Sequence, residues 1–160
     1  MAPLKTLLLG LGNVSRGDDG AGWEVACLFD FLNLPGLETR VAQQLGPEIL
    51  EEWGNFDRVV FVDAAVDGME TRLEKIEKTQ GTPASSTHHL TPQALFSLSR
   101  ALGAYCPELY LCRIPAESFE FGEPFSAATR RHILQAVRLI RGWLGGVAEP
   151  AVQEAQLQQK

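Results

Sequence analysis

Three segments of this sequence carry side chains that could take part in chemistry. Asp19 stands between a glycine-rich turn and an apolar stretch, Asp63 directly follows the apolar run RVVFV, and His88 and His89 stand in a polar segment. Carboxylates and imidazoles together bind zinc, nickel, manganese or iron and discriminate poorly among these ions. Three protein ligands also leave positions open for water or for a substrate group. Two acids and one histidine therefore suit a divalent-metal site.

Each of these residues also has a simpler interpretation. Asp19, or its neighbour Asp18, could cap the helix that follows. Asp63, taken alone, could be a helix cap or a turn residue. The two histidines lie in a segment without apolar periodicity, which makes a buried core histidine less expected. We interpret the third histidine, His132, as an exposed residue of the last helix.

The elements that must position these residues follow from the apolar pattern. Short apolar runs bounded by turn residues alternate with segments of helical periodicity, which is typical of an α/β fold with a mostly parallel sheet and helices on both faces. The expected strands are residues 5–10, 37–44, 58–62, 71–78 (an edge strand) and 109–114, and the expected helices are 23–32, a short one near 49–53, one capped at 91–92, and 127–144. In such sheets ligands bind beyond the carboxyl ends of the strands, which is where Asp19 and Asp63 fall.

Other catalytic schemes find less support in the sequence. Neither GxSxG nor HExxH is present. Ser85 and Ser86 adjoin His88, but nothing marks a third residue that would orient the histidine. Cys27 falls inside an apolar helix and Cys112 inside a strand, and we expect both to be buried. The three cysteines form no CxxC pair and are expected to be reduced.

The turn Gly10-Leu11-Gly12-Asn13 resembles part of a dinucleotide-binding fingerprint. The third small residue of that fingerprint is missing, because Ser15 stands in its place. Two aspartates follow before the helix, and carboxylates repel a pyrophosphate. A nucleotide-using α/β enzyme therefore stays only an alternative.

Composition excludes further classes of function. The chain has 160 residues and a net charge of −6, which argues against a nucleic-acid partner. Four arginines in residues 127–144 fit a solvated helix face. The first nine residues contain an apolar run too short for a signal peptide or a membrane span, so we expect a cytoplasmic protein with no membrane partner. We expect one domain over residues 1–147 and a disordered tail over 148–160.

Four motifs, in this order, resemble the maturation endopeptidases of nickel–iron hydrogenases. They are LLLGLGNVSRGDDGAGWEV at residues 7–25, RVVFVDAA at 58–65, SSTHHLTPQAL at 85–95 and IPAESFEFGEPFS at 114–126. The resemblance spans residues 4–144. It implies a three-layer α/β/α sandwich with a twisted sheet, and a catalytic and metal site formed by Asp19, Asp63 and His88. The first acid is often glutamate in that family and is aspartate here. His88 fits the Ser/Thr-x-His spacing better than His89.

The resemblance also implies an activity. Members of the family remove a C-terminal extension from the large-subunit precursor of a [NiFe]-hydrogenase after nickel insertion. We therefore expect a hydrolase of peptide bonds whose partner is that precursor, with nickel supplied by the substrate and another divalent metal possible in the isolated protein. The resemblance leaves open whether the metal, a water or an aspartate performs the hydrolysis. A departure from the family pattern at residues 44–48 leaves open which hydrogenase is the substrate. For the oligomeric state we favour a monomer. The alternative from another class is a non-catalytic chaperone or binding module for the large subunit.

Overall fold

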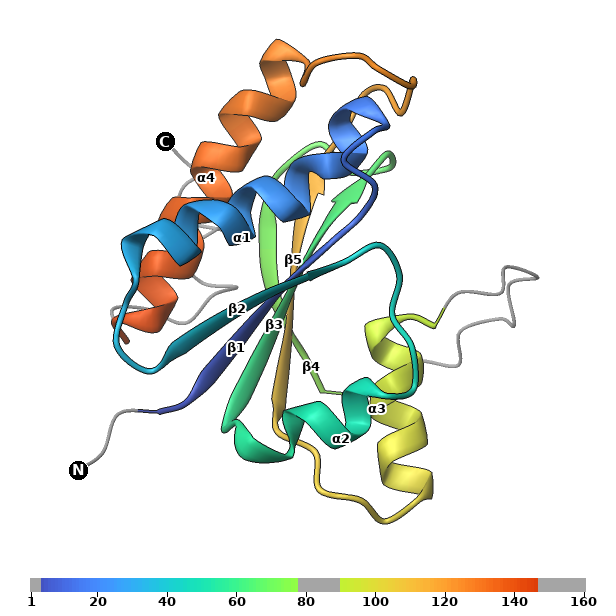
Figure 1. Ribbon diagram of the computed structural model, residues 1–160, viewed down its shortest axis with the longest axis vertical. Helices are drawn as coiled ribbons and strands as arrows, with labels where there is room; N and C mark the ends of the chain where they lie inside the picture. Colours follow the sequence, from blue (N-terminus) through green and yellow to red (C-terminus); the bar gives the residue numbers. More distant parts are fainter. Residues whose placement is uncertain (1–3, 78–89, 147–160) are drawn as a thin grey trace.

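The computed structural model describes residues 4–77 and 90–146 of the chain (Figure 1). Its centre is a five-stranded sheet in the order β2-β1-β3-β5-β4. The strands are β1 (Thr6–Leu11), β2 (Leu37–Ala42), β3 (Arg58–Ala65), β4 (Arg72–Ile76) and β5 (Glu108–Pro115). All neighbouring strands are parallel except β4, which runs antiparallel to β5 at one edge. The predicted mostly parallel sheet and the predicted edge strand are both confirmed.

Helices cover both faces of this sheet and make a three-layer α/β/α sandwich, as expected (Figure 1). One face is covered by α1 (Ala21–Leu32) and α4 (Ala127–Leu144), the other by α2 (Ile49–Glu52), a 3-10 turn at Trp53–Asn55 and α3 (Pro92–Ala101). Two of these helices, α3 and α4, have a short polar residue at the N-cap position. Thr91 Oγ1 accepts a hydrogen bond from Ala94 N (3.0 Å), which confirms the predicted cap, and Ser126 Oγ accepts one from Thr129 N (3.2 Å).

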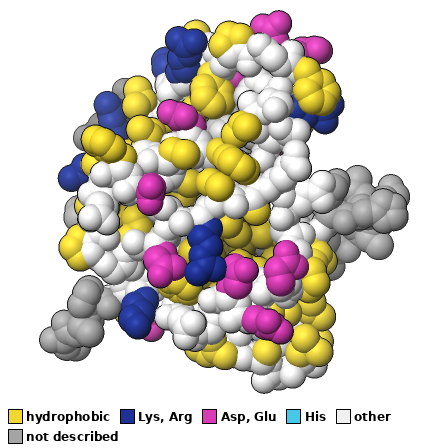
Figure 2. Space-filling view, in the orientation of Figure 1, with side chains coloured by type: hydrophobic (Ala, Val, Ile, Leu, Met, Phe, Trp, Pro, Cys, Tyr) yellow, Lys and Arg dark blue, Asp and Glu magenta, His cyan; other side chains and the backbone are white. Residues whose placement is uncertain are grey.

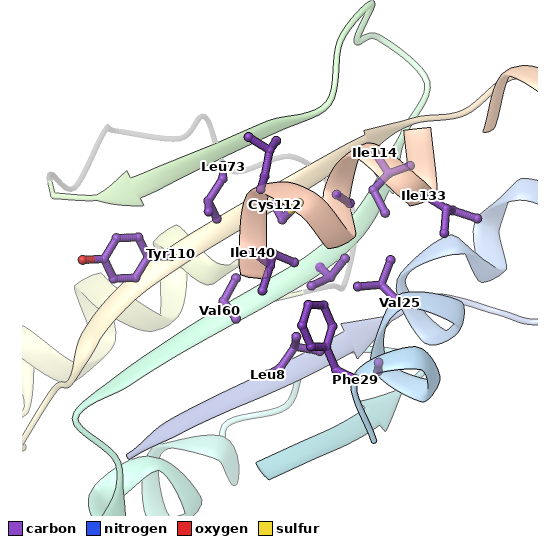
Figure 3. Packing of buried hydrophobic residues seen from close by; sticks show 14 of the residues in the cluster. Leu8, Val25, Phe29, Val60, Leu73, Tyr110, Cys112, Ile114, Ile133 and Ile140 are labelled. Atoms are coloured by element: carbon purple, nitrogen blue, oxygen red, sulfur yellow. The ribbon is translucent and has the colours of Figure 1, made fainter. Parts of the chain in front are cut away.

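Two apolar clusters join the layers, because alternate residues of a strand point to opposite faces. Figure 3 shows the cluster beneath α1 and α4, where Leu8, Val60 and Cys112 of the sheet meet helix side chains such as Phe29. On the opposite face, residues such as Phe61 pack against the second pair of helices. The prediction that Cys112 is buried is confirmed.

Two predictions about single side chains are wrong. Cys27 is exposed, because α1 turns Val25, Ala26 and Phe29 toward the sheet. His132 is half-buried rather than exposed. Its Nδ1 lies 3.2 Å from Thr71 Oγ1 and 2.9 Å from Gln135 Oε1.

The surface of the last helix agrees with the sequence. Its four arginines, Arg130, Arg131, Arg138 and Arg141, are all exposed. Among the described residues, none of the helices is both long enough and apolar enough to cross a membrane. The expected tail at 148–160 lies outside the described residues.

Candidate active site

The site lies where the direction of chain winding in the sheet reverses. The chain passes from β1 through α1 to β2 on one side, and β3 then pairs with β1 on its other side. Ligands of open α/β sheets bind at such a switch point, beyond the carboxyl ends of the strands. Asp19 follows β1 and Asp63 lies near the end of β3, so both predicted acids fall at this point.

Glycines allow the segment after β1 to fold closely over the strand ends. Gly12 has φ of 129°, and a Cβ there would collide with the carbonyl oxygen of Asp19. A Cβ at Gly22 would collide with the carbonyl oxygens of Val62 and Leu11. The start of α1 therefore sits against the ends of β1 and β3 at a distance that only glycine permits, which brings Asp19 to the site.

Asp19 is held by the turn that precedes it. Its Oδ2 accepts a hydrogen bond from the backbone N–H of Asn13 at 2.9 Å, and the side chain is partly buried. The residue that precedes α1 is Gly20, and no side chain caps this helix or the 3-10 turn Gly17–Gly20 before it. The helix-cap interpretation of Asp18 and Asp19 is therefore wrong.

Asp18 has a structural role that the sequence did not reveal. The residue is only 1% exposed. It accepts hydrogen bonds from the backbone N–H groups of Glu117, Ser118 and Ser126, and from the Ser126 hydroxyl, at 2.8–3.2 Å. Burial alone would raise the pKa of this carboxyl, but the four donors outweigh burial, so the pKa is lowered. Asp18 thus connects the first motif with the fourth through hydrogen bonds. Asp19 is the acid of this pair that faces the site.

Asp63 belongs to β3, which continues to Ala65, three residues further than expected. It is therefore neither a helix cap nor a turn residue. Burial raises the pKa of Asp63 to about 6, and the negative charge of Asp19 adds to this effect. A hydrogen bond from the backbone of Ala64 and the positive charge of Arg113, the register partner of Asp63 on β5, act in the opposite direction.

The two acids line one pocket of about 420 Å³. Arg16 and residues 43–45 line it as well, and so do Leu90, Thr91 and Pro92 at the start of α3. We call this the site pocket. Its size lies within the range of ordinary ligand sites. His88 and His89, like Ser85 and Ser86, lie outside the described residues, and the described part of the chain contains no group of three His, Cys, Asp or Glu side chains placed to hold a metal ion.

This arrangement suits a cationic group better than an anionic one. Two carboxylates interact closely enough for one to raise the pKa of the other, and a cation between them would relieve that repulsion. The oxygen donors and their separate origins on β3 and the turn after β1 fit a divalent metal that is completed by further ligands. A pyrophosphate would meet the same negative charges unfavourably.

Comparisons with known proteins bear on the fold. No family model matches the chain, and no curated protein matches it by sequence. Among solved structures, the hydrogenase maturating endopeptidase HybD from E. coli superposes with a TM-score of 0.70 at 21% identity, over 89% of this chain and 93% of that one. The [NiFe] hydrogenase maturation protease HycI from Thermococcus kodakarensis has a TM-score of 0.69 at 23% identity, with the same coverage. The hydrogenase 2 maturation peptidase from a Thaumarchaeota archaeon has 0.64 at 23%, over 90% and 99%. The chain therefore has the fold of these hydrogenase maturation proteases.

Proposed function

We propose that this protein is an endopeptidase that removes the C-terminal extension from the large-subunit precursor of a [NiFe]-hydrogenase. The observation that carries the proposal is that Asp19 and Asp63, from two separate motifs, line one pocket at the switch point of the sheet. The order of the four motifs and the fold shared with solved maturation proteases support the same function.

The third member of the proposed site is His88. The pocket includes Leu90, which comes two residues after His88 in the sequence, together with Thr91, the cap of α3. Only one residue separates His88 from Leu90 in the sequence, so a short length of chain joins this histidine to the lining of the site pocket. His88 is proposed over His89 because of its spacing within the motif.

In this proposal the nickel belongs to the substrate. Asp19, Asp63 and His88 occupy vacant positions of the nickel ion in the precursor and thereby fix the nearby peptide bond against the pocket. A metal so placed can polarise the carbonyl of that bond. Asp63 has a pKa of about 6 and is mostly ionised at neutral pH. It can accept a proton from a water that adds to the carbonyl carbon, and it can then return that proton to the amide nitrogen as the C–N bond breaks.

The test is direct observation of the product. The protein is incubated with candidate nickel-loaded precursors, and the large subunit is weighed by mass spectrometry. We expect a loss of mass equal to a C-terminal segment, and no loss with Asp19→Asn, Asp63→Asn or His88→Ala. His89→Ala is the matched control for the register and should still cleave. A precursor that is bound but never shortened would favour the non-catalytic binding module.

A further inference from the structure

A second groove opens next to the site pocket. It is lined by Gly12–Ser15, Trp23 and Val41–Gln43, and we call it the Trp23 groove. Gly12, Asn13 and Gln43 line both the groove and the site pocket. The two hollows therefore adjoin each other and share part of their walls at the carboxyl ends of β1 and β2.

The groove and the site pocket lie on opposite faces of the sheet. Val41 pairs with Gly10, and its side chain points to the same face as Leu8, the face covered by α1. Asp63 lies two residues after Phe61 and shares the other face. A peptide in both hollows would cross the edge formed by the strand ends and pass beside the turn that carries Asp19.

The lining of the groove carries no charge. Its apolar side chains include those of Val14, Trp23 and Val41, and its polar members, Asn13, Ser15 and Gln43, are neutral. Val14 is 58% exposed and Val41 40% exposed. Hydrophobic side chains gather over α1 on this face of the molecule (Figure 2). A neutral, apolar side chain of a ligand suits this groove. A charged side chain would lose its hydrating water there without gaining an ion-pair partner.

The walls of the groove are held in place before any ligand arrives. The indole N–H of Trp23 donates to the carbonyl oxygen of Ala42 at 3.1 Å, which fixes the ring against the end of β2. The Asn13 side chain accepts a hydrogen bond from the backbone N–H of Ser15 at 2.9 Å, which fixes the turn on the other wall. A rigid apolar hollow loses little entropy on binding.

We propose that the Trp23 groove is a subsite for the cleaved peptide and binds an uncharged, apolar residue close to the bond that is hydrolysed. This inference rests on the proposed function, because it takes the occupant to be the peptide that reaches Asp19 and Asp63. Because the groove shares walls with the site pocket, a peptide bound at Asp19 and Asp63 is the occupant that can also reach the groove. The uncharged lining defines the chemistry of the side chain that binds there.

The first test uses cleavage of the precursor. Val41→Asp and Val14→Asp place a charge in the groove, and each should raise KM about tenfold or more, with a smaller effect on kcat. Val41→Leu keeps the apolar surface and should retain the wild-type KM. Leu134→Asp on α4 is the matched control, because Leu134 is also 58% exposed and does not line the groove. An unchanged KM in both groove variants would overturn the subsite and leave the endopeptidase assignment standing.

The second test needs no hydrogenase precursor. The probe is N-acetyl-leucine methylamide, a neutral apolar peptide fragment, and the readout is the NMR signal of each tryptophan indole N–H. Trp23 is partly exposed, whereas Trp53 and Trp143 are 0% and 4% exposed and serve as internal references. The probe should shift the Trp23 signal in a saturable way, and Val41→Asp should weaken this binding about tenfold. N-acetyl-glutamate methylamide, the charged counterpart, should bind more weakly.

The two tests separate the two proposals. A saturable shift at Trp23, without cleavage of any candidate precursor, would show that the groove binds an apolar side chain, but it would count against the proposed function and against the cleaved peptide as the occupant. A Trp23 signal that does not move with the leucine probe, or that moves equally in Val41→Asp, would overturn the subsite. Equal binding of the leucine and glutamate probes would also overturn the subsite.

Discussion

Asp63→Asn is expected to make the protein more stable at neutral pH and to abolish the proposed activity. In the native protein the pKa of Asp63 is raised from 3.8 to about 6, first by burial and then by the charge of Asp19. Ionisation of Asp63 therefore costs more free energy in the folded chain than in the unfolded one. Asparagine has nearly the same shape and carries no charge, so this cost disappears. A residue kept at a cost to stability is typical of a functional site.

The magnitude follows from the two pKa values. Between pH 3.8 and about 6 the native state binds more protons than the unfolded state, so the free energy of unfolding of the wild type falls as pH rises. A separation of roughly two pKa units, at about 1.4 kcal/mol each, sets an upper limit of about 3 kcal/mol for this loss above pH 6. Asp63 is only partly buried and asparagine remains polar. We therefore expect a gain of about 1–2 kcal/mol for Asp63→Asn.

The assay is urea unfolding followed by circular dichroism, from about pH 4 to about pH 8, with a chelator present. The chelator matters because a bound metal would stabilise the wild type alone. The advantage of Asp63→Asn should be small at low pH, grow through the window from 3.8 to about 6, and then level off. Asp67→Asn replaces an exposed carboxylate in the same way and is the matched control. If Asp63→Asn were equally or less stable at all pH values, the account of Asp63 as a carboxylate that is costly to ionise in the folded protein would be refuted.

Three further predictions concern the hydrogen-bonded carboxylate of Asp18, the cysteines and the substrate. Asp18→Asn should lower the free energy of unfolding by about 3 kcal/mol or more at neutral pH, because asparagine cannot accept all four hydrogen bonds. Since the pKa of Asp18 is lowered, this difference should shrink below pH 3.8, which acid unfolding would measure. Cys112→Ala should cost about 1–2 kcal/mol in urea unfolding, whereas Cys27→Ala, at an exposed position, should stay within about 0.5 kcal/mol; equal losses would contradict the placement of Cys27 on the surface. A precursor purified without nickel should not be shortened, by mass spectrometry, because the acids and histidine gain binding energy only from an ion already held by the substrate; efficient cleavage of the nickel-free form would refute this gating.

The general architecture could be predicted because it depends on local patterns. Apolar runs of strand length, helical periodicity and a Thr-Pro helix start act over a few residues, and they predicted the parallel sheet and the Thr91 cap. The same patterns did not predict that Cys27 is exposed. The α1 sequence AGWEVACLFDFL has apolar residues around most of the helix, so periodicity could not decide which side would meet the sheet.

The sequence by itself determined the sheet class and the candidate acids Asp19 and Asp63, because both follow apolar runs near strand ends. Only the tertiary structure decided which of the adjacent acids, Asp18 and Asp19, faces the site. That choice depends on hydrogen bonds that Asp18 accepts from residues 99–108 positions away in the chain. The raised pKa of Asp63 also depends on the tertiary structure. Burial and the charge of Asp19 raise it only where the glycines allow the start of α1 to pack closely against the strand ends. Interactions between distant segments leave no local pattern in the sequence, so only the tertiary structure could show that these two acids line one site.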